Sequence, residues 1–232
     1  MGCTRLSSAC QVGTIWRVFN LPIGGKSCQA RKMSRGHRCI NDLFRNWTNT
    51  IGPLTQRPGY PGTWDYENTN GLGLIEYLLW AQDIGMEPML GVWAGLWLDG
   101  EIVSEDDLQV YVQSALDELE FLMGDASTEW GSYRESLGYG PFEIGFVEIG
   151  NEDSLNGGAP SYAAYRFQAF HDAIRNAYPD ITIIASYYDV KGSTPPDNAA
   201  GDFHQCKTNL KDGILLQKLS MLTPLPQTLL PN

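Results

Sequence analysis

The sequence predicts an α/β protein in which parallel strands alternate with helices. Apolar residues recur at helical spacing over three segments, 72–83, 108–122 and 165–177. Short apolar runs that are typical of buried strands occupy 88–92, 142–149 and 181–185. This alternation indicates βαβ units and a parallel sheet, which leaves a doubly wound sheet and a (β/α)8 barrel both open. No Gly-x-Gly-x-x-Gly follows these strands, which counts against a dinucleotide-binding fold.

Local signals set the expected limits of each helix. Gly85 ends the first helix, and Ser104 with Asp107 opens the second in the manner of a capping box. Gly124 ends the second helix, and Ser161 is expected to cap the third. The segments 51–70 and 125–141 are expected to be loops because of their Gly, Pro, Ser and Asn content. The leucine-rich tail allows a short helix through Leu222.

Charge and cysteine content divide the chain into three segments. A head, 1–45, holds eight Lys or Arg against one Asp, a body, 46–206, holds five against twenty-five acidic residues, and a tail, 207–232, holds three against one. Four of the five cysteines lie in the head and the fifth is Cys206. The distribution suggests that head and tail differ in sequence origin from the body.

Several classes of function are excluded by these features. An acidic body would repel nucleic-acid phosphates and suits a neutral substrate such as a polysaccharide. The longest apolar run, 89–98, has ten residues, too short for a membrane span, which needs ~18. The cysteine spacings match no zinc site. Neither a metal nor an organic cofactor is implied by the sequence. No signal peptide is visible.

The stretch around Asn151 and Glu152 is the strongest candidate site. The apolar run that ends at Ile149 is followed by Gly150 and then by an amide and a carboxylate side by side. Residues just beyond the C-terminal end of a parallel strand face the functional side of such folds. A carboxylate placed there, beside an amide able to bind a sugar hydroxyl, suits acid/base chemistry on sugars. The alternative is that Glu152 only caps or salt-links the next loop.

Six stretches, taken in order along the chain, extend this observation. They are Ile-Gly-Pro-Leu with Arg-Pro-Gly (51–59), Gly-Thr-Trp (62–64), Asn-Thr-Asn-Gly-Leu-Gly-Leu-Ile-Glu-Tyr (68–77), Phe-Leu-Met-Gly-Asp-Ala-Ser (121–127), Val-Glu-Ile-Gly-Asn-Glu-Asp (147–153) and Gly-Asp-Phe-His-Gln (201–205). Together they resemble the family-51 glycoside hydrolases, the α-L-arabinofuranosidases, in their fungal form, over residues 47–205.

The resemblance implies a partial (β/α)8 TIM barrel. A full barrel needs ~250 residues, and the matched part supplies about strands two to six, without the C-terminal β-sandwich of the family. The stretch 18–25 resembles a degenerate form of the family's second strand. Lys26 stands where the family has a substrate-binding asparagine, so that contact is not transferred.

The resemblance also assigns roles to site residues. Glu152 would be the general acid/base, and Asn151 would bind the sugar 2-hydroxyl. His204 matches a histidine near the carboxylates, although Cys206 replaces the family's tyrosine, and a structural histidine is the alternative. Trp64 would stack on a sugar at the rim of the site, or else pack as a core aromatic. His171 and His37 are expected to be structural or exposed.

The second catalytic carboxylate is missing. A retaining glycosidase needs an acid/base and a nucleophile roughly 5 Å apart, and the family's nucleophile is a downstream glutamate, yet no glutamate follows Glu152. Three hypotheses remain: a retaining α-L-arabinofuranosidase acting on arabinan or arabinoxylan, with this chain truncated and poorly active; a non-catalytic carbohydrate-binding remnant; or another retaining glycosidase on the same barrel. The family implies an extracellular location, and Asn46-Trp47-Thr48 is a glycosylation sequon. Oligomeric state is not predicted.

Overall fold

A six-stranded sheet forms the centre of the computed structural model, which describes residues 11–12, 15–19, 46–61, 67–97, 100–188, 199–208 and 215–220. Its strands lie in the order β1-β2-β5-β6-β7-β8, where β1 is Gln11–Val12 and β2 is Ile15–Phe19. The other four are β5 (Glu87–Val92), β6 (Phe146–Ile149), β7 (Thr182–Ala185) and β8 (Ala200–Gly201).

All strands from β2 to β8 in this sheet are parallel, and only β1 runs antiparallel. Met89 pairs with Phe146, which in turn pairs with Thr182. Strand order follows chain order without reversal, whereas a doubly wound sheet reverses its order at a switch point. The C-terminal ends of β5, β6 and β7 therefore lie next to one another.

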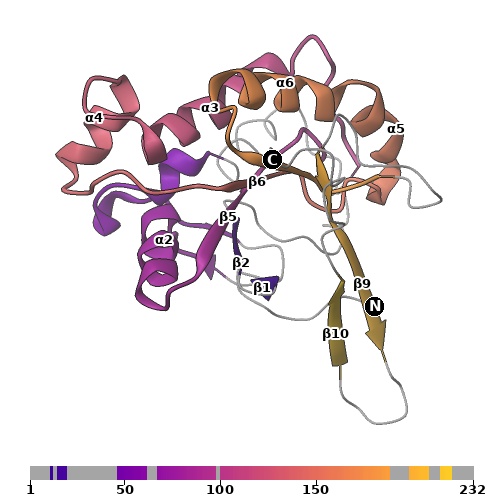
Figure 1. Ribbon diagram of the computed structural model, residues 1–232, viewed down its shortest axis with the longest axis horizontal. Coiled ribbons are helices and arrows are strands. Elements are labelled where there is room, and N and C mark those ends of the chain that lie inside the picture. The colour runs from indigo at the N-terminus through magenta and orange to yellow at the C-terminus, as the bar shows by residue number, and fades with distance from the viewer. Residues whose placement is uncertain are drawn as a thin grey trace, which may run out of the picture.

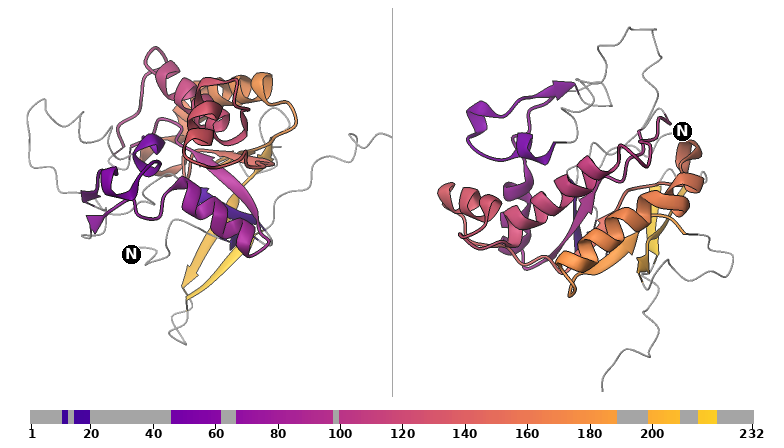
Figure 2. Two further views of the ribbon diagram at one scale, coloured as in Figure 1. Left: turned by 90° about the vertical axis from the view of Figure 1, so that its left-hand side faces the viewer. Right: turned by 90° about the horizontal axis from the view of Figure 1, so that it is seen from above.

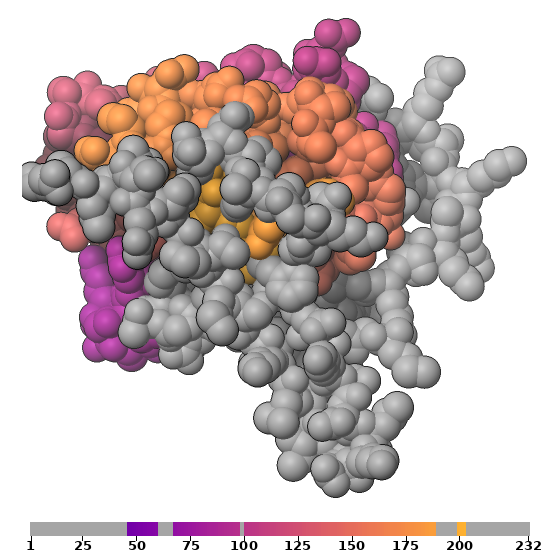
Figure 3. Space-filling model, turned by 45° about the vertical axis from the view of Figure 1, so that its right-hand side comes forward, coloured from indigo at the N-terminus to yellow at the C-terminus, as the bar shows by residue number. Residues whose placement is uncertain are grey.

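Helices lie between successive strands from β2 to β7, as the sequence predicts. They are α2 (Leu74–Asp83), α3 (Gln109–Met123), α4 (Glu129–Ser136), α5 (Ala159–Ser161) and α6 (Phe167–Ala177), with one turn of π-helix, η4 (Tyr162–Arg166), between α5 and α6. Helices α3 and α6 contact each other and run side by side above the sheet (Figure 1, Figure 2). In the space-filling view, the orange segments that include α6 form the upper part of the face (Figure 3).

The core divides between the two faces of the sheet. Leu90, Val92, Val147 and Ile149 pack with buried residues of α2, α3 and α6 in one large cluster. Met89 and Ile184 belong to a second, smaller cluster. Side chains alternate between the faces of a strand, so Glu148, which is fully buried, lies on the face opposite Val147 and Ile149.

Short elements outside the sheet complete the described structure. They are η1 (Trp47–Thr50), η2 (Leu54–Gln56), η3 (Leu155–Gly157), the paired strands β3 (Tyr60–Pro61) and β4 (Glu67–Asn68), and the antiparallel hairpin of β9 (Phe203–Thr208) and β10 (Leu215–Ser220). The hairpin extends away from the six-stranded sheet (Figure 1). In the part of the chain that is described, no helix has the length and apolar character of a membrane span.

The segment that contains η2 is tied to α2 by one arginine. Arg57 donates to both carboxylate oxygens of Glu76, at 2.7 and 2.8 Å, and to the carbonyl oxygens of Gly52 and Asn70. Glu76 in turn accepts from the N–H of Gly73, at 2.9 Å, where the helix begins. This exchange satisfies a backbone donor at the helix N-terminus that has no partner within the helix.

Several of the expected elements differ in the structure. The segment 125–141 contains α4 instead of only a loop, because Thr128 caps it and Arg134 donates to the carbonyl oxygens of Phe121 and Leu122. These interactions are polar, so helical periodicity did not reveal them. Ser161 lies inside the helical segment that starts with α5 instead of capping it.

Two more expectations concern the ends of the chain. The strand expected at 18–25 is β2, which begins earlier and shares only Val18 and Phe19 with that range; 20–25 lies outside the described residues. In place of a helix through Leu222, 215–220 is the strand β10, paired in register with β9. Apolar runs this short are ambiguous between helix and strand, and pairing with a second strand decides the outcome.

Candidate active site

A tight turn follows strand β6 and carries the candidate side chains. The N–H of Gly150 donates to the carbonyl of Val92 on β5, at 2.7 Å, and Gly150 has φ +80°. Glu152 also has a positive φ, +52°, and both it and Asn151 are partly exposed. The turn therefore lies at the C-terminal end of a strand with parallel neighbours on both sides, where the sequence predicts the site.

Glu152 adopts a backbone conformation that is unfavourable for a residue with a side chain. A non-glycine residue in the left-handed region is destabilised by about 1–3 kcal/mol, and such residues cluster at functional sites. Gly150 has no such penalty, but a Cβ at that position would overlap Oδ2 of Asp153. The carboxylate of Asp153 therefore lies directly against the turn. Position 150 requires glycine because of its positive φ and because a Cβ would collide with Asp153.

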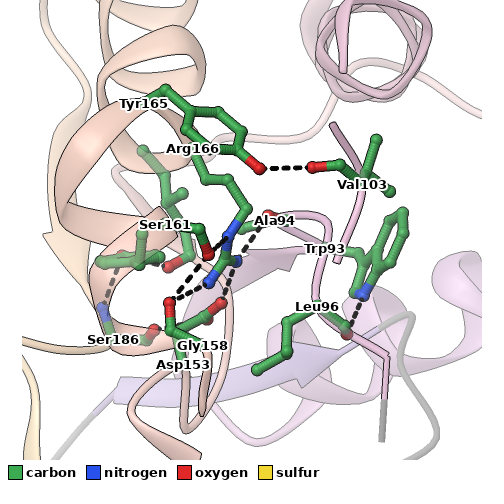
Figure 4. A network of polar contacts seen from close by, with 12 residues as sticks. Trp93, Ala94, Leu96, Val103, Asp153, Gly158, Ser161, Tyr165, Arg166 and Ser186 are labelled. Atoms are coloured by element: carbon green, nitrogen blue, oxygen red, sulfur yellow. Dashed lines mark hydrogen bonds and ion pairs between the residues drawn. The ribbon is translucent and has the colours of Figure 1, made fainter. Parts of the chain in front are cut away.

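A buried ion pair holds this carboxylate in place. Arg166, which is 0% exposed, donates from Nη1 to Oδ1 of Asp153, which is 1% exposed. Its other donors reach the carbonyl oxygens of Ala94 at 2.7 Å and Gly158 at 2.8 Å, and the hydroxyl of Ser161 at 3.0 Å. Figure 4 shows the guanidinium group between these acceptors.

Two hydroxyl groups extend the network to the neighbouring strand. Ser186, immediately after β7, donates from Oγ to Oδ2 of Asp153 at 2.8 Å. The hydroxyl of Tyr162 accepts from the N–H of Ser186 at 3.1 Å and donates to the carbonyl of Ile149 at 2.6 Å. The network thus joins the C-terminal ends of β5, β6 and β7.

Burial dominates the electrostatics of the network. It raises the pKa of Asp153 above its usual value, while the charge and hydrogen bond of Arg166, the hydroxyl of Ser186 and the backbone of Asn151 oppose the rise. Burial, together with the Asp153 carboxylate, raises the pKa of Tyr162 well above its usual value. Tyr162 therefore keeps its proton and remains a donor to Ile149.

The sequence-predicted site residues are only partly brought together. Asn151 and Glu152 lie in the same turn. His204 lies in β9 opposite Leu219 of β10, and only its backbone is described. Trp64 and His37 lie outside the described residues, so the role of Trp64 stays a prediction. His171 is buried on α6 beside Phe167, its Nδ1 is 3.1 Å from Asp172, and it does not contribute to the turn.

Sequence reasoning missed Asp153, Arg166 and Ser186. One signal was available: Arg166 stands four residues from both Tyr162 and Phe170, on the apolar stripe of the helical segment, where a charged side chain calls for a buried partner. Among the described residues, no group of three or more His, Cys, Asp or Glu side chains is arranged to hold a metal ion.

Known proteins resemble this chain over most of its length. Residues 36–216 match the family model described as the alpha-L-arabinofuranosidase 1 domain. The probable alpha-L-arabinofuranosidase A of Aspergillus terreus is 48% identical over 168 residues, which cover 70% of this chain and 27% of the relative. Alpha-L-arabinofuranosidase 1 of Arabidopsis thaliana is 35% identical, over 75% of this chain and 27% of the relative.

Solved structures give the same result. The arabinose-bound MgGH51 α-L-arabinofuranosidase superposes with a TM-score of 0.59 at 41% identity, covering 65% of this chain and 24% of that one. The arabinose complex of the Thermotoga maritima α-L-arabinofuranosidase gives 0.50 at 28% identity, covering 60% and 28%. The chain therefore spans about a quarter of the length of the proteins that it matches.

Proposed function

Because this chain belongs to the family of the alpha-L-arabinofuranosidase 1 domain, we propose that it carries the acid/base half of a retaining α-L-arabinofuranosidase site. Glu152 is the general acid/base in this proposal, and Asn151 binds the 2-hydroxyl of the sugar. The single observation that carries the assignment is the position of Glu152, in a left-handed turn directly after the strand β6 and backed by a buried polar network.

The proposed reaction has two steps. Glu152, as the acid, gives its proton to the glycosidic oxygen while a second carboxylate attacks the anomeric carbon and the leaving group departs. Glu152, now a carboxylate, then takes a proton from the water that releases arabinose from the covalent intermediate. Asn151 contributes most in the transition state, when its hydrogen bond to the 2-hydroxyl strengthens.

The second carboxylate is not supplied by this sequence, which has no glutamate after Glu152. A strand order that follows the chain order fits a section of a (β/α)8 barrel, and the remaining strands of that barrel would hold the nucleophile. We therefore expect the 232-residue chain on its own to be a poor catalyst. Terminal arabinofuranosyl groups of arabinan or arabinoxylan are the proposed substrates, and the proposed location is outside the cell.

A chimera tests the assignment of Glu152. Residues 46–205 replace the matching segment of the Aspergillus terreus relative, which supplies the rest of the protein, and the chimera is assayed with an aryl α-L-arabinofuranoside. We expect Glu152→Ala to lower kcat by about 10²–10⁴-fold, the usual contribution of acid/base catalysis. Added azide needs no base to attack the intermediate, so it should restore turnover and give an arabinosyl azide of retained configuration.

Glu105→Ala is the matched control, because Glu105 is exposed on the loop before α3. A folded, active chimera that is indifferent to Glu152→Ala would overturn the proposal. A folded chimera that binds arabinose without hydrolysing any arabinoside would favour the carbohydrate-binding remnant instead. The same assay on the 232-residue chain should be blank with and without Glu152→Ala, and a panel of other aryl glycosides would identify a different retaining glycosidase.

A further inference from the structure

The conformation of the candidate catalytic turn needs an external cause. Glu152 has φ +52°, and Gly150, two residues earlier, has φ +80°. A residue with a side chain stays in this region only where the surrounding structure holds it there. The turn is short and follows the rigid strand β6, so the direction of the Asn151 and Glu152 side chains depends on how the next residue, Asp153, is held.

Asp153 contacts both sides of the turn. Its Oδ2 lies where a side chain of residue 150 would have to go. The backbone of Asn151 also makes a hydrogen bond to the carboxyl group of Asp153. The side chain of Asp153 therefore points back under the two residues that carry the proposed chemistry, while Glu152 remains partly exposed.

Arg166 fixes Asp153 relative to three strands. It donates to Asp153 and to the carbonyl of Ala94, which lies two residues beyond β5, and Ser186, beyond β7, donates to the other oxygen of Asp153 (Figure 4). These contacts join residues that are 72 and 33 positions apart in the chain. They connect the turn to both neighbouring strands of the parallel sheet.

Stability alone is a weak reason for such a pair. Removing two charges from water is so unfavourable that apolar residues of the same volume often stabilise a core equally well or better. What a buried, fully hydrogen-bonded pair provides is a single geometry. In this protein the fixed geometry is that of the turn 150–153.

We propose that Asp153 and Arg166 are positioning residues, which hold the left-handed turn and thereby set the direction of the Asn151 and Glu152 side chains. The functional part of this inference rests on the function proposed above, and the conformational part does not. Both side chains are buried and act through the turn rather than on the substrate. Ser186 supports the pair directly through its hydroxyl group, and the hydroxyl of Tyr162 holds the backbone of Ser186.

The experiment uses nuclear magnetic resonance on the isotope-labelled 232-residue chain. The Cα and Cβ chemical shifts of Asn151 and Glu152 report the backbone conformation, and Glu152→Gln assists their assignment. The variants are Asp153→Asn, Ser186→Ala and Tyr162→Phe. Arg134→Met is the matched control, because Arg134 is also a buried arginine that donates to carbonyl oxygens, but of α3 and the segment that follows α4.

We expect the signals of Glu152 to lose their positive-φ shifts in Asp153→Asn, either by moving or by splitting into several conformers. Ser186→Ala and Tyr162→Phe should move the same signals less far in the same direction, and they decide the test if Asp153→Asn does not fold. Arg134→Met should lower the melting temperature and leave the Glu152 signals in place.

Unchanged Glu152 signals in a folded Asp153→Asn chain, or equal changes in Arg134→Met, would refute the inference. This readout does not require hydrolysis, so it separates the two proposals. If the Glu152 signals respond but the chimera is indifferent to Glu152→Ala, the proposed function fails and the control of the turn by Asp153 stands.

Discussion

Removal of the Arg166 guanidinium group should be among the most destabilising single changes in this protein. In Arg166→Met the apolar stem is kept, but the carboxylate of Asp153 remains buried without its counter-charge, and the carbonyls of Ala94 and Gly158 lose a donor. Breaking a buried pair from one side costs about 3–5 kcal/mol, and each lost hydrogen bond adds about 1 kcal/mol. Because whole proteins are stable by about 5–15 kcal/mol, this variant should be close to unfolding.

The double variant Asp153→Asn/Arg166→Met separates buried charge from lost packing. It removes the unpaired carboxylate, so it should be more stable than Arg166→Met alone by about 1 kcal/mol or more. Urea unfolding followed by circular dichroism and by tryptophan fluorescence gives the free energies. The reasoning is refuted if Arg166→Met costs less than about 1 kcal/mol, or if the two single effects simply add in the double variant.

Two further predictions concern the partly buried ion pair of Arg57 and Glu76 and a glycine. Burial acts to raise the pKa of Glu76, but hydrogen bonds from Arg57 and the backbone outweigh it and hold the pKa below 4.5. The stability from the charged form is therefore present above about pH 4.5 and lost as pH falls through the lower folded-state pKa. The stability advantage of the wild type over Glu76→Gln should shrink as the pH falls below about 4.5 in a series of urea titrations, and a constant difference would contradict this account. Gly150→Ala should cost about 1–3 kcal/mol more than Gly85→Ala: both positions have positive φ, but a Cβ meets Asp153 Oδ2 at Gly150 and nothing within 4 Å at Gly85. Equal melting temperatures for the two variants would show that Asp153 does not sterically exclude a side chain at position 150.

The sequence alone determined the alternation of strands and helices and the position of the candidate acid/base residue. Periodicity is a local property, and the runs that predict β5, β6 and β7 are short, mostly apolar and separated by helical segments. The end of β6 at Ile149 follows from Gly150, so the placement of Glu152 just beyond a strand could be predicted without coordinates. The family resemblance is also a property of the sequence and was confirmed by the match over 36–216.

Only the tertiary structure decided how the turn is held. An arginine on a helix is normally a surface residue, and its burial depends on partners that the chain brings from distant positions, such as Ala94 and Ser186. The left-handed conformation of Glu152 has no signature in residue type, because it is imposed by contacts of the neighbouring Asp153. Similarly, 215–220 became a strand because β9 was available to pair with it. Local patterns specify elements, whereas burial and pairing, which depend on the whole fold, specify the geometry in which their side chains can act.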